Sequence, residues 1–304
     1  MRIQAEPEWE DIAHALMTDR GTVLLIGATD SGKSTLAQYL IRRLVAEKIR
    51  ATLIDSDIGQ SSLGLPGTIS MKTFNRSEDT EHFRPQRMIF IGALNPAKAI
   101  PAVIGGVKKM AEISRKRGVD LIVADTSGLI SGWPGKTLKK GKIDILRPRH
   151  VLALQQHHEL EHILTSCEGA HVHRMRPSKG VRARSREARI RYRMGKFRAY
   201  FRAAEVIGVP YKGMEFLEKR KDLDIRSKAL EPGTLLGLNS GSMTRSLGLL
   251  IQRRRDGMLI KTPLRSLRWI KRIIVGDIVL RELVEKPGIA DASWSMCMMP
   301  RNPV

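Results

Sequence analysis

The 304-residue chain is 42% hydrophobic and 28% charged, which is typical of a folded globular protein and excludes intrinsic disorder. Its 53 Lys and Arg against 31 Asp and Glu give a net charge of +22, so we expect a polyanionic partner, with nucleic acid first and an anionic membrane second. Two cysteines cannot form a disulfide framework or a four-cysteine zinc site, and neither a signal peptide nor a membrane-spanning run is recognisable, so we expect a cytoplasmic protein without a membrane segment.

The first part of the sequence alternates between helical and strand patterns. Residues 1–20 form a short lead-in with apolar residues at helical spacing: Trp9, Ile12, Ala13 and Leu16. Short apolar runs predict strands at 22–26, 51–55, 88–91, 121–124 and 151–154. Helical patterns lie between them, notably from 34 to about 49 and from 98 to 117. This alternation predicts an α/β domain of three layers, with helices on both faces of a mostly parallel sheet.

The pattern changes near residue 230. Beyond it, β-like runs separated by turns lie at 234–238, 247–252, 258–261 and 273–280. We therefore expect a main domain over 21–228 and a small β-rich C-terminal domain over 229–304.

A phosphate-binding loop follows the first predicted strand. The segment matches GxxxxGK[ST] in full and opens a predicted helix: Gly27, Ala28, Thr29, Asp30, Ser31, Gly32, Lys33 and Ser34. The glycines allow backbone N–H groups to wrap the phosphates, and the helix N-terminus adds partial positive charge. Lys33 is expected to reach the β- and γ-phosphates of ATP, and Ser34 to bind Mg²⁺. Such a loop serves GTPases, motor ATPases and kinases alike, so it does not name the reaction.

An acidic loop follows the second predicted strand and contains Asp55, Asp57 and Gln60. In an open α/β sheet, ligands bind at this end of the strands. One carboxylate there can orient the water shell of Mg²⁺, and the other can accept a proton from an attacking hydroxyl. The alternative is an ordinary turn with helix-capping aspartates.

The acidic loop, Asp55-x-Asp57-x-Gly59-Gln60 followed by Leu65-Pro66-Gly67-Thr68, resembles a signature of the polynucleotide 5′-hydroxyl kinase family. The family's phosphate loop commonly reads like the string from Asp30 to Thr35. The resemblance implies phosphorylation of the 5′-hydroxyl end of RNA or DNA with ATP and Mg²⁺. It also implies that Asp57 contacts the 5′-hydroxyl and the metal, and that Gln60 and Asp55 belong to the same environment.

A second family element is a clasp of form Thr-x-Gly-Trp after a central strand. Thr126 and Gly128 match it, whereas Leu129 replaces the tryptophan that is expected to stack on a base. Trp133, four residues later, is a candidate replacement. The alternative for Trp133 is a partly buried loop aromatic.

The third element is an arginine lid of form Arg-x-x-x-Arg. The segment from Ser185 through Arg189 and Arg193 resembles the lid helix, and Arg189 and Arg193 are one turn apart. They can close over the transferring phosphoryl group and neutralise its charge. Ten Arg and two Lys lie between 174 and 202 against one acid, and Arg182 is a candidate polynucleotide contact. The alternative is a solvated basic face.

Two other functions remain open. One is an ATP-binding RNA-processing scaffold with little turnover, which the replacement at Leu129 favours. The other is an assembly-type P-loop ATPase, which the lid arginines and the acidic loop disfavour. The sequence distinguishes neither RNA from DNA nor one nucleoside triphosphate from another, and it identifies no protein partner.

Overall fold

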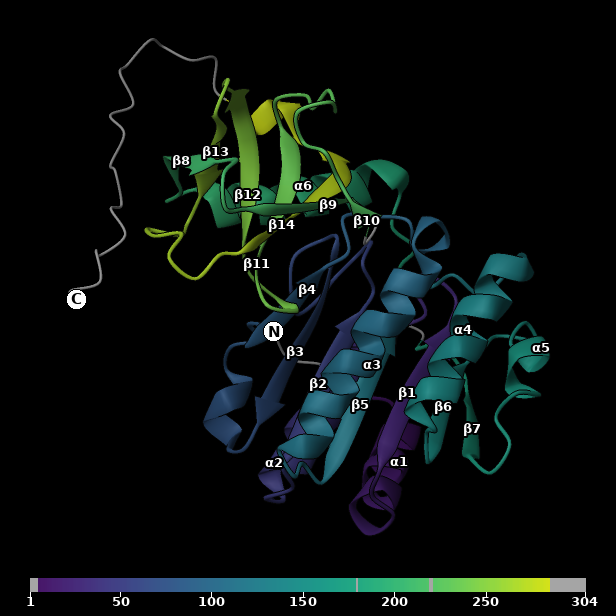
Figure 1. Cartoon of the computed structure of the whole chain (residues 1–304). Coiled ribbons are helices and arrows are strands. Elements are labelled where there is room, and N and C mark those ends of the chain that lie inside the picture. The colour runs from purple at the N-terminus through teal and green to yellow at the C-terminus, as the bar shows by residue number, and fades with distance from the viewer. Residues whose placement is uncertain (1–4, 179, 219–220, 285–304) are drawn as a thin grey trace. The chain divides into compact units, whose positions relative to one another are not determined.

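The computed structural model describes residues 5–178, 180–218 and 221–284, and the chain divides into two compact units, Met1–Arg193 and Met194–Val304. The division lies within helix α6 (Arg186–Phe201), well before the boundary at 228/229 that the sequence suggested. Figure 1 shows the helices and strands of each unit.

The first unit contains a mixed sheet in the order β4-β3-β2-β5-β1-β6-β7. Its strands are β1 (Thr22–Gly27), β2 (Ala51–Ser56), β3 (Thr68–Phe74), β4 (Arg87–Phe90), β5 (Leu121–Thr126), β6 (His150–Leu154) and β7 (His171–Met175). The run from β2 to β7 is parallel, which confirms the mostly parallel sheet, while β3 and β4 add an antiparallel edge. Strands β3 and β7 were not predicted.

Helices cover both faces of this sheet. They are α1 (Pro7–Thr18), α2 (Lys33–Ala46), α3 (Ile100–Lys116), α4 (Gly132–Leu146) and the short α5 (Glu161–Leu164), with 3₁₀ turns η1 (Ser77–Thr80) and η2 (Pro96–Lys98). One apolar cluster joins α1 and α2 to alternate residues of the strands, such as Val23, Leu25, Val123 and Leu152. Helices α3 and α4 pack together in front of the sheet in Figure 1. The lead-in helix predicted from Trp9, Ile12, Ala13 and Leu16 is confirmed, since all four are buried.

The second unit is rich in strands, as the sequence predicted. Its order is β10-β9-β14-β11-β12, continued by β13 and β8. The strands are β8 (Glu205–Pro210), β9 (Glu215–Glu218), β10 (Lys221–Asp222), β11 (Thr234–Ser240), β12 (Met243–Arg253), β13 (Gly257–Thr262) and β14 (Arg272–Val279), followed by η3 (Arg281–Leu283). Because β8 pairs with β13 and β9 with β14, strands on both sides of residue 228 belong to one sheet, and this corrects the predicted boundary.

Within the described ranges, every helix is too short or too polar to cross a lipid bilayer.

Candidate active site

The phosphate-binding loop connects β1 to α2 through backbone conformations that favour small or special residues. Gly32 has φ +91° and Asp30 has φ +57°, both in the left-handed region. A Cβ atom on Gly27 would lie 2.6 Å from Ser31 Oγ and 2.7 Å from the carbonyl oxygen of Leu154. Helix α2 begins at Lys33, so its first N–H groups point at the loop, as an anion site requires.

Lys33 lies folded over the loop that precedes it. Its Nζ donates to the carbonyl oxygen of Ala28 at 2.6 Å and to Ser31 Oγ at 3.1 Å, and the residue is only 5% exposed. Burial lowers the pKa of Lys33, while the nearby carboxylates of Asp125 and Asp57 raise it in part. The side chain can therefore exchange these neutral acceptors for phosphate oxygens without entering from solvent.

Asp125, at the end of β5, is the acidic partner of the loop. Ser34 Oγ donates to its Oδ2 at 2.5 Å, and its buried Oδ1 has no hydrogen-bond partner among the described residues. Burial and the neighbouring carboxylate of Asp55 raise the pKa of Asp125 to about 7. A hydroxyl beside a carboxylate with an unsatisfied oxygen is a donor set suited to Mg²⁺. Ser34 and Asp125 could therefore hold the metal.

The two aspartates of the acidic loop have different environments. Asp55 is fully buried, and its carboxylate accepts from the backbone N–H groups of Asp57, Ser62 and Leu63 at 2.7–3.0 Å and from Ser61 Oγ at 2.8 Å. Its oxygens are thus occupied in shaping the loop. Asp55 thus has a structural role in the loop, and the substrate contact expected for it from sequence stays a prediction.

Asp57 is only half-buried. Its Oδ1 accepts from the N–H groups of Gly59 and Gln60, both at 3.0 Å, while Oδ2 has no hydrogen bond from any described residue. Gln60 Nε2 donates to the carbonyl oxygen of Gly59, and its buried Oε1 has no partner within the described ranges. Asp57 is the carboxylate of this loop with an oxygen available to a ligand.

The residues of the clasp pattern lie at different depths. Thr126 is buried, donates from Oγ1 to the carbonyl oxygen of Leu25 at 2.8 Å and supports the strand end. Gly128 packs against the phosphate loop, since a Cβ there would be 2.3 Å from the amide nitrogen of Thr29. Trp133, at the start of α4, is 74% exposed, which rules out the partly buried alternative. Trp133 is therefore far more exposed than Thr126, which is buried, and Gly128, which is partly buried.

Arginines from the lid region contact the phosphate loop through Asp30. Arg189 Nη2 lies 2.8 Å from Asp30 Oδ2, and Arg184 donates to the same carboxylate from its backbone N–H at 3.0 Å and from Nε at 3.1 Å. Burial raises the pKa of Asp30, but these hydrogen bonds outweigh it and lower the pKa overall. Tyr192 Oη donates to the carbonyl oxygen of Ser61 at 2.9 Å. The start of α6 is thereby tied to both loops of the site.

Arg193 lies beside this contact. Burial lowers the pKa of Arg193, and the positive charge of Arg189 lowers it further. Two guanidinium groups that repel each other next to a phosphate loop are stabilised by an anion between them. Arg182 is exposed, and Ile190 of α6 is 43% exposed. Phe197 and Phe201, in the later part of this helix, are buried.

Two buried lysines of α4 add positive charge beside the carboxylates of the site. They were not predicted from the sequence. Lys139 Nζ donates to Thr126 Oγ1 at 2.8 Å and to the carbonyl oxygen of Ser127, and Lys142 Nζ donates to Ser56 Oγ at 2.7 Å. Burial lowers the pKa of Lys142 to about 8, although the aspartates of the site raise it in part. A signal existed in the sequence, since both lysines share a helix face with Leu138, Ile143 and Leu146.

The carboxyl ends of β1, β2 and β5 therefore gather three carboxylates, Asp55, Asp57 and Asp125, with three lysines, Lys33, Lys139 and Lys142. The parallel register accounts for this, because Asp55 pairs with Asp125 and Ser56 with Thr126.

Residues 27–203, which make up more than half of the chain, match the family model of the mRNA cleavage and polyadenylation factor CLP1 P-loop. The chain belongs to this family.

Curated relatives agree with that membership. The chain is 35% identical over 187 residues to a polyribonucleotide 5′-hydroxyl-kinase of Pyrococcus horikoshii, which covers 61% of the chain and 51% of that protein. It is 31% identical over 194 residues to one of Methanocaldococcus jannaschii, covering 62% and 52%. The chain thus spans about half the length of these relatives. The structure of a Clp1p–Pcf11p complex is similar in fold, with a TM-score of 0.73 and 12% sequence identity. The match covers 90% of the present chain and 79% of the matched chain in that complex, which supports the fold.

Proposed function

We propose that the chain transfers the γ-phosphoryl group of ATP to the 5′-hydroxyl end of a polynucleotide, with Mg²⁺ as the metal. The observation that carries the proposal is the meeting of Asp57, the phosphate loop and Arg189 at one edge of the sheet. Family membership and the names of the relatives support the same reaction, and the proposal covers RNA and DNA ends alike.

The phosphate loop would bind the donor. Backbone N–H groups of residues 28–35 and the N-terminus of α2 favour the phosphates, and Lys33 exchanges its present acceptors for β- and γ-phosphate oxygens. Ser34 and Asp125 would hold Mg²⁺, which, when bound, neutralises charge on the phosphates. Ionised Asp125 suits a cation better than its protonated form, so metal and proton compete there.

Asp57 would act on the acceptor. The N–H groups of Gly59 and Gln60 hold Oδ1 and so fix the orientation of the carboxylate, which leaves Oδ2 to accept the proton of the 5′-hydroxyl. Gln60 and Asp55 would serve this group indirectly, since both shape the loop that carries Asp57. The metal role expected for Asp57 would then be indirect, through bound water.

Arg189 and Arg193 would neutralise the charge that spreads over the oxygens of the transferring group. In the present arrangement Arg189 is paired with Asp30, so the nucleotide phosphates compete with that carboxylate for the guanidinium group. This competition would couple donor binding to the position of the lid residues.

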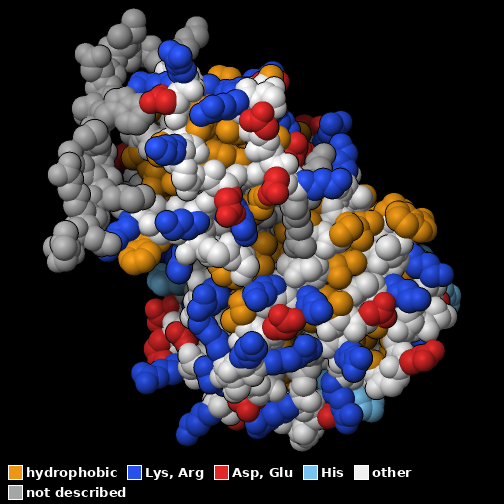
Figure 2. Space-filling model, in the orientation of Figure 1, with side chains coloured by type: hydrophobic (Ala, Val, Ile, Leu, Met, Phe, Trp, Pro, Cys, Tyr) orange, Lys and Arg blue, Asp and Glu red, His pale blue; other side chains and the backbone are white. Residues whose placement is uncertain are grey.

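The polynucleotide acceptor is supported by charge. The net charge of +22 favours a polyanion, and Figure 2 shows Lys and Arg side chains distributed over most of the visible face. Exposed Arg182 and Trp133 would contribute contacts to the phosphate backbone and to a base, respectively. The second candidate function, an ATP-binding RNA-processing scaffold, is favoured by Leu129 in the clasp, where the family pattern has a tryptophan.

An ADP-release assay distinguishes the two candidates. With ATP, Mg²⁺ and an excess of enzyme, we expect one ADP per 5′-hydroxyl end added and background release with 5′-phosphorylated ends. A scaffold would bind ATP but release no ADP in response to 5′-hydroxyl ends, and this result would refute the kinase.

The lid arginines give a kinetic prediction. Arg189→Ala and Arg193→Ala should each lower kcat by about 10²-fold with little change in the KM for polynucleotide, because the contact is made mainly in the transition state. Arg182→Ala is the matched control and should mainly raise that KM. Steady-state kinetics at saturating ATP measure both. A pure KM effect at Arg189 and Arg193 would reduce them to ordinary contacts of a basic surface.

The buried lysines give a pH prediction. Lys142→Met removes a cation that faces Asp125, so the Asp125 carboxylate, whose pKa is already raised to about 7, becomes harder to ionise. Asp125 must be ionised to hold Mg²⁺ well, so the acidic limb of the pH–rate profile should move to higher pH. Lys140→Met, on the exposed side of α4, is the control and should leave the profile in place. A lower rate at every pH with an unshifted limb would mean that Lys142 acts through packing alone.

A further inference from the structure

Trp269 lies in the loop between β13 and β14 of the second unit and is 67% exposed. Burying such an indole would contribute a few kcal/mol, at about 25 cal/mol per Å² of apolar surface, so exposure forgoes a large stabilisation. The guanidinium carbon of Arg268 lies 5.0 Å from the ring centroid, within the range of a cation–π contact. The loop thus presents an aromatic ring and a cation together to solvent.

In this loop an apolar residue followed by a basic residue recurs every three positions. Leu264, Leu267 and Ile270 pack against the core of the second unit. The next residue in each case is basic and exposed: Arg265, Arg268 and Lys271.

The backbone of this loop is anchored at two points. The N–H of Ile270 donates to the carbonyl oxygen of Leu267 at 2.8 Å, and that of Lys271 donates to Asn239 at 3.1 Å. The anchoring holds the three basic side chains and Trp269 on the outer side of the loop. The surface is therefore set by the backbone before any ligand arrives.

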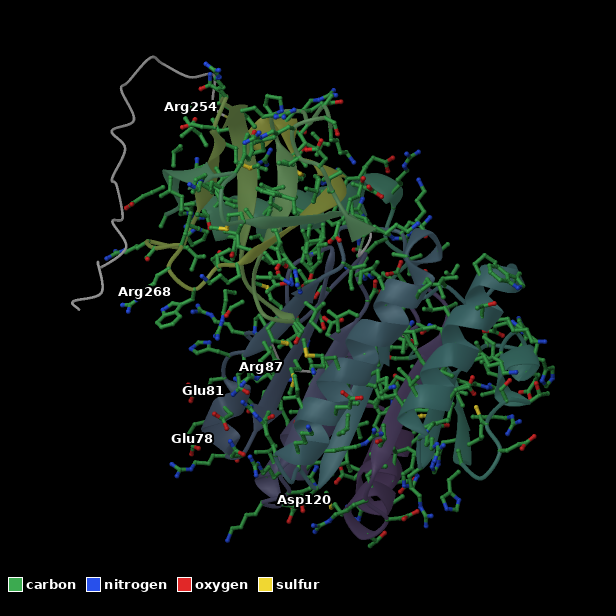
Figure 3. All side chains as sticks on the ribbon, viewed as in Figure 1. Glu78, Glu81, Arg87, Asp120, Arg254 and Arg268 are labelled. Atoms are coloured by element: carbon green, nitrogen blue, oxygen red, sulfur yellow. The ribbon has the colours of Figure 1, made fainter. Side chains whose placement is uncertain are left out.

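The charged side chains of this loop are all positive. The sequence has no acidic residue from 257 to 276. Among the residues that the structure describes, Arg265, Arg268 and Lys271 make no ion pair, whereas the following Arg272 pairs with Glu215 at 2.6 Å. Figure 3 labels Arg268 and Arg254, whose side chains extend outward from this unit. Three cations without acidic partners beside an exposed ring suit a ligand that offers both anions and flat apolar faces.

We propose that Arg265, Arg268, Trp269 and Lys271 form a binding surface for single-stranded polynucleotide, in which a base stacks on Trp269 and the basic residues contact its phosphates. Single strands fit because their bases are unstacked and their phosphates are closely spaced, whereas a duplex hides the faces of its bases. The surface deepens the proposed function, since its ligand would be the acceptor strand of the kinase. It would hold that strand through nucleotides other than the reacting end.

The test is fluorescence anisotropy with a labelled 20-nucleotide single strand, without ATP, so that binding is measured apart from turnover. Trp269→Ala should weaken binding about 5-fold or more, the usual effect of losing one stacked base, and Trp269→Phe should restore most of it. Arg265→Ala with Arg268→Ala should lower the slope of log affinity against log salt by about 1.4, at about 0.7 for each phosphate contact. Arg245→Ala, an exposed arginine of β12, is the control and should change neither quantity.

The outcomes separate this surface from the kinase. Weaker binding by Trp269→Ala would support the surface even if no phosphoryl transfer were found. Wild-type affinity and an unchanged salt slope in both loop variants would overturn it even if transfer were efficient. Co-sedimentation with anionic phosphatidylserine vesicles, or self-association in sedimentation velocity, that depends on Trp269 while strand binding does not, would also overturn it and indicate a membrane or protein contact instead.

Discussion

Lys33→Ala should lower the rate of phosphoryl transfer about 10³-fold, at the upper end of the range for removing one preorganised charge contact. The side chain is buried in the loop and makes its contacts there with Ala28 and Ser31, so it is already placed where phosphates would bind. Its removal leaves neutral acceptors that backbone and water can satisfy, so the fold should persist. Single-turnover rates and thermal unfolding of the same samples measure the two effects.

Lys140→Ala is the matched control for this variant. Lys140 lies on the exposed side of α4, next to buried Lys139. Replacing it by alanine removes the same positive charge from the chain as Lys33→Ala does. Its rate should stay close to that of the wild type. A well-folded Lys33→Ala protein that transferred phosphoryl groups at the wild-type rate would place the active site elsewhere.

Asp57→Asn should lower turnover about 10²-fold or more, the range for a positioned acid–base group. The amide keeps the size of the side chain and can still accept from Gly59 and Gln60, but it cannot take up a proton. ATP affinity should change little. Transfer rates and equilibrium nucleotide binding separate the two.

Asp55→Asn is the variant to compare with Asp57→Asn, because the two carboxylates differ in their hydrogen bonds. Its carboxylate accepts several N–H and O–H groups in a buried position, so an amide NH₂ would face donors, at a cost of about 2 kcal/mol or more. We expect a fall in melting temperature of several degrees, roughly 2–4 °C per kcal/mol for a domain of about this size. If Asp55→Asn kept full stability but lost turnover, while Asp57→Asn stayed active, the roles of the two aspartates would be exchanged.

The sequence alone predicted the parts of the site that lie in one contiguous string. The phosphate loop, its strand and its helix are local features, since glycines, an apolar run and helical spacing all occur within residues 22–46. The parallel sheet followed from the same local signals. The family resemblance assigned Asp57 to the 5′-hydroxyl and the metal and Asp55 only to the same environment. The saturation of the Asp55 carboxylate could not be predicted, because it depends on how the following loop folds around it.

The residues that sequence reasoning missed depend on contacts between distant strands. Asp125 meets Ser34 because β5 lies between β1 and β2, an order that no local pattern specifies. Lys142 reaches Ser56 for the same reason, across 86 positions of sequence. The boundary near 228 was wrong because turn residues mark the ends of strands, not of domains, and β8 and β9 pair with strands far along the chain.

The most direct measurement of phosphoryl transfer is to locate, on the acceptor strand, the labelled phosphate that comes from γ-labelled ATP. The protein is incubated with γ-labelled ATP, Mg²⁺ and matched oligoribonucleotides and oligodeoxyribonucleotides that carry either a 5′-hydroxyl or a 5′-phosphate. We expect labelled product from 5′-hydroxyl strands alone. A phosphatase should remove the label, and digestion of the strand should release it on the 5′-terminal nucleotide. Strands that stay unlabelled with the folded, ATP-binding protein, or label that appears equally with 5′-phosphorylated strands, would contradict the proposed function.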